Sequence, residues 1–169
     1  MKTLVIAPHP DDETLGVGGT IFKRIHQKKK VGLVIVTSLN KKTNKKDYIN
    51  SKNQLARALK IYKINDVFEL NYLASHLNYK NLNQLIGDFS KIFKKFRPNE
   101  LFIPHLSDVH TDHQIIFKAI ASTTKTFRYP FIKKILSYET ISETGFGVKK
   151  NKKDITFRPD YFVDISKYF

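Results

Sequence analysis

The chain has 169 residues, no cysteine and a formal net charge of +15. This length suffices for one domain with a buried core, and the lack of cysteine excludes disulfides, thiolate metal sites and cysteine nucleophiles. The first apolar stretch is too short for a signal peptide, and no apolar run approaches the roughly 18–20 residues of a membrane span. We therefore expect a cytoplasmic protein with no transmembrane segment.

The positive charge comes mainly from lysine. Of the 30 basic residues only five are arginine, and the lysines are scattered along the chain. Proteins that bind nucleic acid usually concentrate their charge, favour arginine for base contacts and interleave aromatic residues. We interpret the lysines as solvated surface residues and expect no specific nucleic-acid partner. An anionic partner, such as a membrane surface or a phosphorylated substrate, is the alternative explanation.

Short apolar runs alternate with amphipathic stretches along most of the chain. The runs predict strands at 2–7, 31–37, 67–70, 101–103, 135–140 and 161–165, and the stretches predict helices at 12–27, 47–63, 79–96 and 113–126. This alternation predicts an α/β fold, a Rossmann-like, doubly wound, mostly parallel sheet with helices on both faces. Right-handed crossovers in such a sheet place the first and fourth strands side by side.

A histidine and adjacent carboxylates stand where the first strand gives way to the first helix, in Ala7-Pro8-His9-Pro10-Asp11-Asp12-Glu13. Ligands of open α/β sheets bind beyond the carboxyl ends of the strands, and these residue types suit a metal and a base. Capping of the helix is the alternative, and it accounts for one of the two aspartates. Three glycines follow, at 16, 18 and 19, and they indicate either close packing or close approach of a ligand.

A second cluster, Ser107-Asp108-Val109-His110-Thr111-Asp112-His113, follows the fourth strand. If the first and fourth strands are neighbours, both clusters meet at one crevice. A catalytic zinc needs three nitrogen or oxygen ligands and one open position, which two histidines and one carboxylate supply. A remaining carboxylate can accept a proton from water, and a remaining histidine can stabilise an oxyanion or protonate a leaving group. The alternative is that His110 and His113 are exposed loop residues.

The two motifs resemble the signatures of the PIG-L / LmbE-like zinc-dependent N-deacetylases. Residues 7–13 match the family's A/P-H-P-D-D-E, and residues 110–113 match its second signature, H-x-D-H. Residues 136–142 look like the family's fifth-strand segment, so the resemblance covers essentially the whole chain. It implies a single domain over 1–169. Because the family usually continues with a further helix, we expect this chain to lack that helix.

The resemblance implies hydrolysis of an acetamido group on an N-acetylglucosamine-type small molecule or glycoconjugate, releasing acetate and a free amine. The implied cofactor is zinc, with another divalent metal as the alternative. The implied ligands are His9, Asp12 and His113, and the implied catalytic groups are Asp11 as general base, His110 as oxyanion stabiliser and Asp112 as the partner of an imidazole. Candidate substrate contacts at the same end of the sheet are His76, His105 and Glu139.

Two other functions stay open from sequence. One is a metal hydrolase of another amide or of a phosphorylated sugar, with the choice made by residues 38–50, 71–80 and 139–153. The other is a non-catalytic α/β protein that binds an anion or nucleic acid, which only the basic charge supports. The oligomeric state is not predicted.

Overall fold

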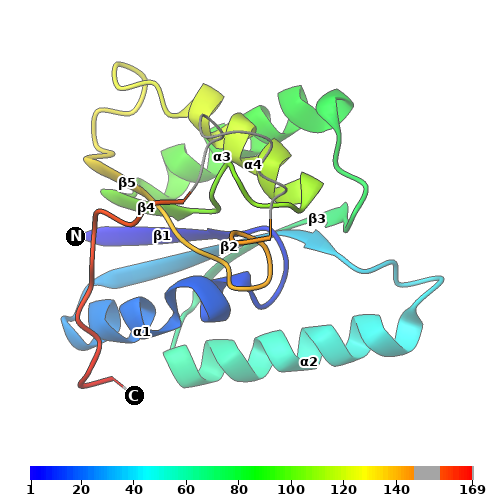
Figure 1. The fold of residues 1–169 in the computed structure, drawn as a ribbon, viewed down its shortest axis with the longest axis horizontal. Helices are drawn as coiled ribbons and strands as arrows, with labels where there is room; N and C mark the ends of the chain where they lie inside the picture. The colour runs from blue at the N-terminus through cyan, green and yellow to red at the C-terminus, as the bar shows by residue number, and fades with distance from the viewer. Residues whose placement is uncertain (147–156, 169) are drawn as a thin grey trace.

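A computed structural model describes residues 1–146 and 157–168. Within them, five strands form one parallel sheet in the order β3-β2-β1-β4-β5 (Figure 1). The strands are β1 (Lys2–Ala7), β2 (Lys30–Ser38), β3 (Asp66–Leu73), β4 (Glu100–Ile103) and β5 (Lys134–Ser137). The helices are α1 (Asp12–His26), α2 (Lys45–Tyr62), the 3-10 turn η1 (Tyr79–Asn81), α3 (Leu82–Phe96) and α4 (Thr111–Thr123). The predicted α/β fold is confirmed.

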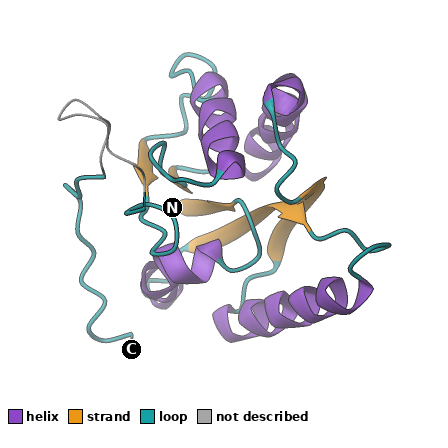
Figure 2. Cartoon of the chain, turned by 45° about the vertical axis from the view of Figure 1, so that its right-hand side comes forward, coloured by secondary structure: helices purple, strands orange, loops and turns teal. Residues whose placement is uncertain are grey.

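Helices cover both faces of the sheet, with α1 and α2 on one face and α3 and α4 on the other (Figures 1 and 2). The β1 strand shows why its sequence is continuously apolar. Leu4 and Ile6 belong to the core under α3 and α4, whereas Val5 and Ala7 belong to the core under α1 and α2. Successive side chains of a strand point to opposite faces, so a strand covered on both sides is apolar at every position.

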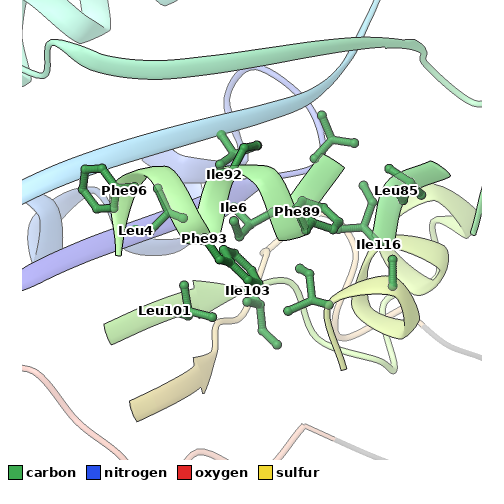
Figure 3. Close-up of a cluster of buried hydrophobic side chains, with 14 of the residues drawn as sticks. Leu4, Ile6, Leu85, Phe89, Ile92, Phe93, Phe96, Leu101, Ile103 and Ile116 are labelled. Atoms are coloured by element: carbon green, nitrogen blue, oxygen red, sulfur yellow. The ribbon is translucent and has the colours of Figure 1, made fainter. Parts of the chain in front are cut away.

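The larger core forms around α3. The apolar side of this amphipathic helix packs on the sheet, and Phe89 and Phe93 are fully buried beside Ile116 of α4 (Figure 3). Full burial of a large apolar side chain contributes about 1.5–3 kcal/mol. This packing holds α3 and α4 on the sheet and so fixes where the loop before α4 begins.

A buried ion pair anchors α1 at the end away from the first motif. Arg24 donates from Nε and Nη2 to the two carboxylate oxygens of Glu100, both at 2.9 Å, and Thr3 Oγ1 donates to Glu100 Oε2. The bidentate geometry joins α1 to the amino end of β4. The first motif is thereby held between β1 and a helix that is fixed at its far end.

The switch point of the sheet lies between β1 and β4. The chain runs outward from β1 through β2 to β3 and then returns to β4 on the other side of β1, with Leu4 paired to Leu101 and Val5 to Phe102. The predicted adjacency of the first and fourth strands is confirmed. The loops after β1 and β4 therefore emerge side by side, where a ligand is expected.

Two predictions about the last strands are wrong. The β5 strand ends at Ser137 rather than at residue 140, because β4, the strand it pairs with, ends at Ile103. The predicted strand at 161–165 is an irregular segment. Lys23 Nζ of α1 donates to Asp164 O, and Lys134 Nζ of β5 lies 4.0 Å from the centroid of the Tyr161 ring, so side chains rather than a backbone ladder hold this segment beside α1 and β5.

The predicted helices are correct in number and order, with ends displaced by up to three residues. Residues 147–153 of the segment expected to influence substrate choice lie outside the described residues. Among the described helices, none combines the length and apolar character needed to cross a membrane.

Candidate active site

Three side chains from the two motifs converge at the carboxyl ends of β1 and β4. His9 Nδ1 lies 3.3 Å from Asp12 Oδ2 and 3.3 Å from His113 Nε2, and His113 Nε2 lies 3.2 Å from Asp12 Oδ2. Ligand atoms about 2.0–2.2 Å from a tetrahedral zinc are separated by roughly 3.3–3.6 Å. The three atoms therefore have the spacing of one triangular face of such a site, and these residues can hold a metal ion.

Each histidine of this triad is oriented by a carboxylate on its other ring nitrogen. His9 Nε2 lies 3.1 Å from Asp112 Oδ2, and His113 Nδ1 lies 2.8 Å from Asp108 Oδ2. An ionised carboxylate only accepts, so these ring nitrogens carry the protons. When the rings lose their second proton, their lone pairs point inward, the arrangement that favours metal binding. Asp112, which we expected to orient an imidazole, contacts that of His9, and its catalytic role stays a prediction.

Asp108 and Asp112 are themselves fully buried and firmly held. Asp112 accepts from the backbone N–H groups of Ser75 and Leu77, at 2.7 and 3.1 Å. Asp108 accepts from Thr144 Oγ1 at 2.7 Å. The loops after β3 and β5 thus support the two carboxylates that orient the histidines, and a site assembled this way is rigid before any ligand arrives.

A second group of possible ligands is His9, His110 and Asp112, and each group has its ligand atoms within 4.8 Å of one another. The Asp112 oxygens already accept from His9 and from two backbone N–H groups. The group of His9, Asp12 and His113 therefore fits a metal better.

The charges of the triad are strongly coupled. Burial lowers the pKa of both histidines, but hydrogen bonds to carboxylates outweigh it. Bonds to Asp112 and Asp12 raise the pKa of His9 to about 9, and bonds to Asp108 and Asp12 raise that of His113 to about 9. Burial opposes ionisation of Asp12, yet hydrogen bonds from the two imidazoles hold the pKa of Asp12 well below its usual range. The site thus holds an ionised carboxylate and attracts positive charge, in the form of protons or of a metal.

Asp11 lies beside the triad in a strained conformation. Its φ is 154° and its ψ is −27°, and its side chain makes no capping hydrogen bond to α1. Such a conformation costs on the order of 1–3 kcal/mol for a residue with a side chain, and it is characteristic of functional sites. Although the residue is exposed overall, partial desolvation and then the charge of Asp12 raise the pKa of Asp11.

Capping does not explain the two aspartates. Asp11 stands at the N-cap position without using its carboxylate there, and Asp12 Oδ2 accepts from His9 N at 2.8 Å. The Asp12 carboxylate therefore faces the site, and the Asp11 carboxylate does not cap the helix.

His110 stands at the edge of the triad, with its ring centroid 4.5 Å from that of His9. Its Nδ1 accepts from Asp112 N at 3.1 Å. Burial, and then the charge of His9, lower the pKa of His110. The neutral ring therefore carries its proton on Nε2, where it is a hydrogen-bond donor. The alternative that His110 and His113 are solvent-exposed loop residues is wrong for His113, which is fully buried.

Two of the three glycines after the first motif, Gly16 and Gly18, are explained by close packing. A Cβ on Gly16 would lie 2.3 Å from Tyr138 Cδ2, and one on Gly18 would lie 2.8 Å from Tyr62 OH. Between them, Val17 has non-helical φ and ψ, so α1 is kinked. Tyr138 in turn donates to Ile6 O at 2.8 Å. Glycine at 16 and 18 lets two tyrosines approach the start of α1.

The candidate substrate contacts line two different cavities. His105 and Glu139 line a cavity of about 590 Å³ between α1, β5 and residues 157–165. His76 lines a smaller hollow of about 300 Å³ at the ends of β2 and β3. None of the three belongs to either group of possible metal ligands. Their role as substrate contacts stays a prediction.

Sequence reasoning missed two residues of the site. Asp108 orients His113, and Glu13, only 2% exposed, accepts from the backbone N–H of Asp11. Asp108 lies in the second motif, but its spacing of five residues from His113 matches no simple helical or strand pattern. Glu13 lies in the first motif, and the carboxylate at that place was the only sequence feature that could have indicated its part in the site.

Comparison with known proteins places this geometry in a class. A solved structure of N,N'-diacetylchitobiose deacetylase from Pyrococcus horikoshii has a TM-score of 0.72 and 24% identity, covering 98% of this chain and 64% of that protein. A conserved protein from Thermus thermophilus has a TM-score of 0.66 and 21% identity, covering 80% of this chain and 64% of that protein. The chain thus spans less than two thirds of either protein, and the two matches show a common fold.

Sequence comparison identifies the family. The family model described as PIG-L, GlcNAc-PI de-N-acetylase, matches residues 4–124. The protein named Uncharacterized deacetylase YaiS, from Escherichia coli (strain K12), is 28% identical over 144 residues, which are 82% of this chain and 74% of that protein. The fold and the family model therefore place the chain in the class of de-N-acetylase-like proteins. More particularly, the chain belongs to the PIG-L family.

Proposed function

We propose that this chain is a zinc-dependent hydrolase that removes the acetyl group from an N-acetylated amino sugar, free or in a glycoconjugate. The observation that carries the proposal is the convergence of His9, Asp12 and His113, with ligand atoms 3.2–3.3 Å apart. A set of two imidazoles and one carboxylate suits zinc, and three protein ligands leave a position open for chemistry. Among structures of this fold, one is a chitobiose deacetylase by its name, which supports the sugar class.

A bound metal would supply Lewis acidity at the amide carbonyl and lower the pKa of water. The chain's own residues supply the proton transfers. Asp11, with its raised pKa and a carboxylate free of capping bonds, accepts a proton from the attacking water. The water oxygen bonds to the carbonyl carbon, and that proton then passes to the departing nitrogen as the C–N bond breaks. The products are acetate and an amine.

His110 stabilises the oxyanion in this proposal. Because Nδ1 accepts from Asp112 N, the Nε2–H of the neutral ring is free to donate to the carbonyl oxygen as negative charge develops. Asp112 and Asp108 act through the histidines: each holds one imidazole with its lone pair toward the metal position.

Acetate release tests the proposal. The zinc-loaded protein is incubated with a panel of N-acetylglucosamine conjugates and of other N-acetylated amides, and acetate is quantified. We expect release from at least one acetamido sugar. Release of acetate only from another amide would refute an amino sugar as the substrate. If no substrate released acetate and the protein bound no divalent metal, the proposal that the chain is a metal-dependent hydrolase would be refuted.

Asp11→Asn tests the general base. The variant retains its metal content but loses about 10²–10⁴-fold in kcat, because the amide cannot accept the proton. Asp66→Asn is the matched control, since Asp66 forms a surface ion pair with Lys30 at the start of β3, on the opposite edge of the sheet. Normal turnover by Asp11→Asn would show that another group is the base.

A further inference from the structure

The backbone of Asp11 is held by main-chain contacts and by one side chain. Its carbonyl oxygen accepts from the N–H groups of Thr14 and Leu15, both at 2.9 Å. Its own N–H is shared between Glu13 Oε2 and the carbonyl oxygen of His9, both at 3.1 Å. Asp11 therefore keeps an unusual φ of 154°, and its carboxylate makes no capping hydrogen bond to α1. Glu13 is the one side chain that bonds the backbone of Asp11 among the described contacts.

Glu13 is the middle of a directed chain of hydrogen bonds. Tyr62 OH donates to Thr14 Oγ1 at 3.1 Å, and Thr14 Oγ1 donates to Glu13 Oε1 at 2.9 Å. Each hydroxyl uses its single proton once, so the chain runs without conflict from the last residue of α2 to the Asp11 amide. Gly18 leaves the space that brings the Tyr62 hydroxyl within reach of Thr14, because a Cβ there would lie 2.8 Å from that oxygen.

Stability alone gives no reason for a carboxylate at position 13. Glu13 is 2% exposed, and no ion pair of Glu13 occurs among the described residues. Burial of a carboxylate without a positive partner is costly, and an apolar side chain of similar size would fill the same space without that cost. An apolar side chain could not, however, accept the hydrogen bond that the Asp11 N–H donates.

We propose that Glu13 is a positioning residue that keeps the Asp11 carboxylate directed at the metal site. Glu13 is itself held by the hydrogen bond from Thr14, which in turn accepts from Tyr62. This inference rests on the proposed role of Asp11 as the general base. Without the acceptor at position 13, the Asp11 backbone relaxes to the extended conformation usual at an N-cap. Its carboxylate then accepts from the N–H groups of the first turn of α1, as aspartate does at helix starts, and is no longer free to act as a base.

Glu13→Leu tests the proposal, with Glu13→Gln as the matched control. We expect Glu13→Leu to fold, to bind zinc as the wild type does, and to lose about 10²-fold in kcat with little change in KM, because a base displaced by about 1 Å costs that much. Glu13→Gln keeps an oxygen that accepts from the Asp11 amide, so its kcat stays within about threefold of the wild type. A merely structural role would lower stability and leave the kcat of the folded fraction unchanged.

A crystal structure of Glu13→Leu separates this proposal from the proposed function. We expect Asp11 to adopt a negative φ with its carboxylate within hydrogen-bond distance of the backbone N–H of position 13 or of Thr14. An unchanged Asp11 backbone, an unchanged kcat or a loss of zinc would each overturn the positioning role. Absence of acetate release by the wild type would instead overturn the proposed function, and the backbone comparison would still decide the role of position 13.

Thr14→Val provides a second variant if Glu13→Leu does not fold. It keeps the shape of the side chain but removes the hydroxyl that donates to Glu13 Oε1. We expect a lower kcat with unchanged zinc binding, and a wild-type kcat would overturn the proposal.

Discussion

Replacement of Asp108 by asparagine tests how His113 is held for the metal. Asp108 is fully buried, and its Oδ2 lies 2.8 Å from His113 Nδ1, while its Oδ1 accepts from Thr144 Oγ1 at 2.7 Å. Asparagine can still turn its oxygen toward His113. It lacks the negative charge that makes the imidazole a stronger ligand, and its NH₂ group cannot accept from Thr144.

The expected loss follows from the role of such partners. Removing a carboxylate that orients a metal-binding histidine typically costs about 10–100-fold in metal affinity, or about 1.4–2.8 kcal/mol. The affinity is measured by titrating the metal-free protein with zinc in competition with a chromophoric chelator. We expect Asp108→Asn near the lower end of this range, because one hydrogen bond to His113 survives, and Asp108→Ala near the upper end.

Thr144→Val separates orientation of His113 from general support of the loop. It removes the bond to Asp108 Oδ1 but leaves the Asp108–His113 contact in place. We expect it to lower stability by about 1–3 kcal/mol, because buried polar groups lose a partner, and to change zinc affinity by less than about threefold. Equal zinc affinity in Asp108→Asn and the wild type, or an equal loss in Asp108→Asn and Thr144→Val, would refute the reasoning.

Three further predictions follow from the same contacts. Gly16→Ala lowers the free energy of unfolding by about 1–3 kcal/mol, because the added Cβ meets the Tyr138 ring. Gly87→Ala raises it by up to about 1 kcal/mol, because a Cβ there has nothing within 4 Å. Equal effects of the two substitutions in denaturant titrations would contradict this packing. The Asp11→Gly variant is more stable than the Asp11→Ala variant by about 1 kcal/mol, because glycine tolerates a φ of 154°. The reverse order in thermal unfolding would contradict the backbone strain at this position. At pH 7 the metal-free histidines of the triad, with pKa about 9, are protonated, so binding of chelator-buffered zinc releases protons. The number of protons released falls as pH rises through about 9. It is measured by calorimetry in buffers of different ionisation enthalpy, and a number that stays constant with pH would contradict the protonated state of the two histidines.

The strands and helices up to β5 were predictable because their signals are local. Continuous apolar runs identify doubly covered strands, and the stripe of α3 identifies a core helix. The neighbouring positions of β1 and β4 followed from the handedness of crossovers rather than from any one residue. The run at 161–165 misled the prediction, since an apolar run becomes a strand only where its backbone pairs with another strand, and this segment is held by side chains of α1 and β5 instead.

The sequence by itself determined the inventory of the site: the imidazoles and carboxylates in two motifs, and their meeting at the switch point of a parallel sheet. Only the tertiary structure decided which nitrogen of His9 and His113 faces the metal position, because that depends on the carboxylates of Asp112 and Asp108 behind them. It also decided that Asp11 is free and strained rather than a helix cap. Spacing along the chain identifies ligand types, whereas ring orientation and carboxylate direction arise from hydrogen bonds between loops that are distant in sequence.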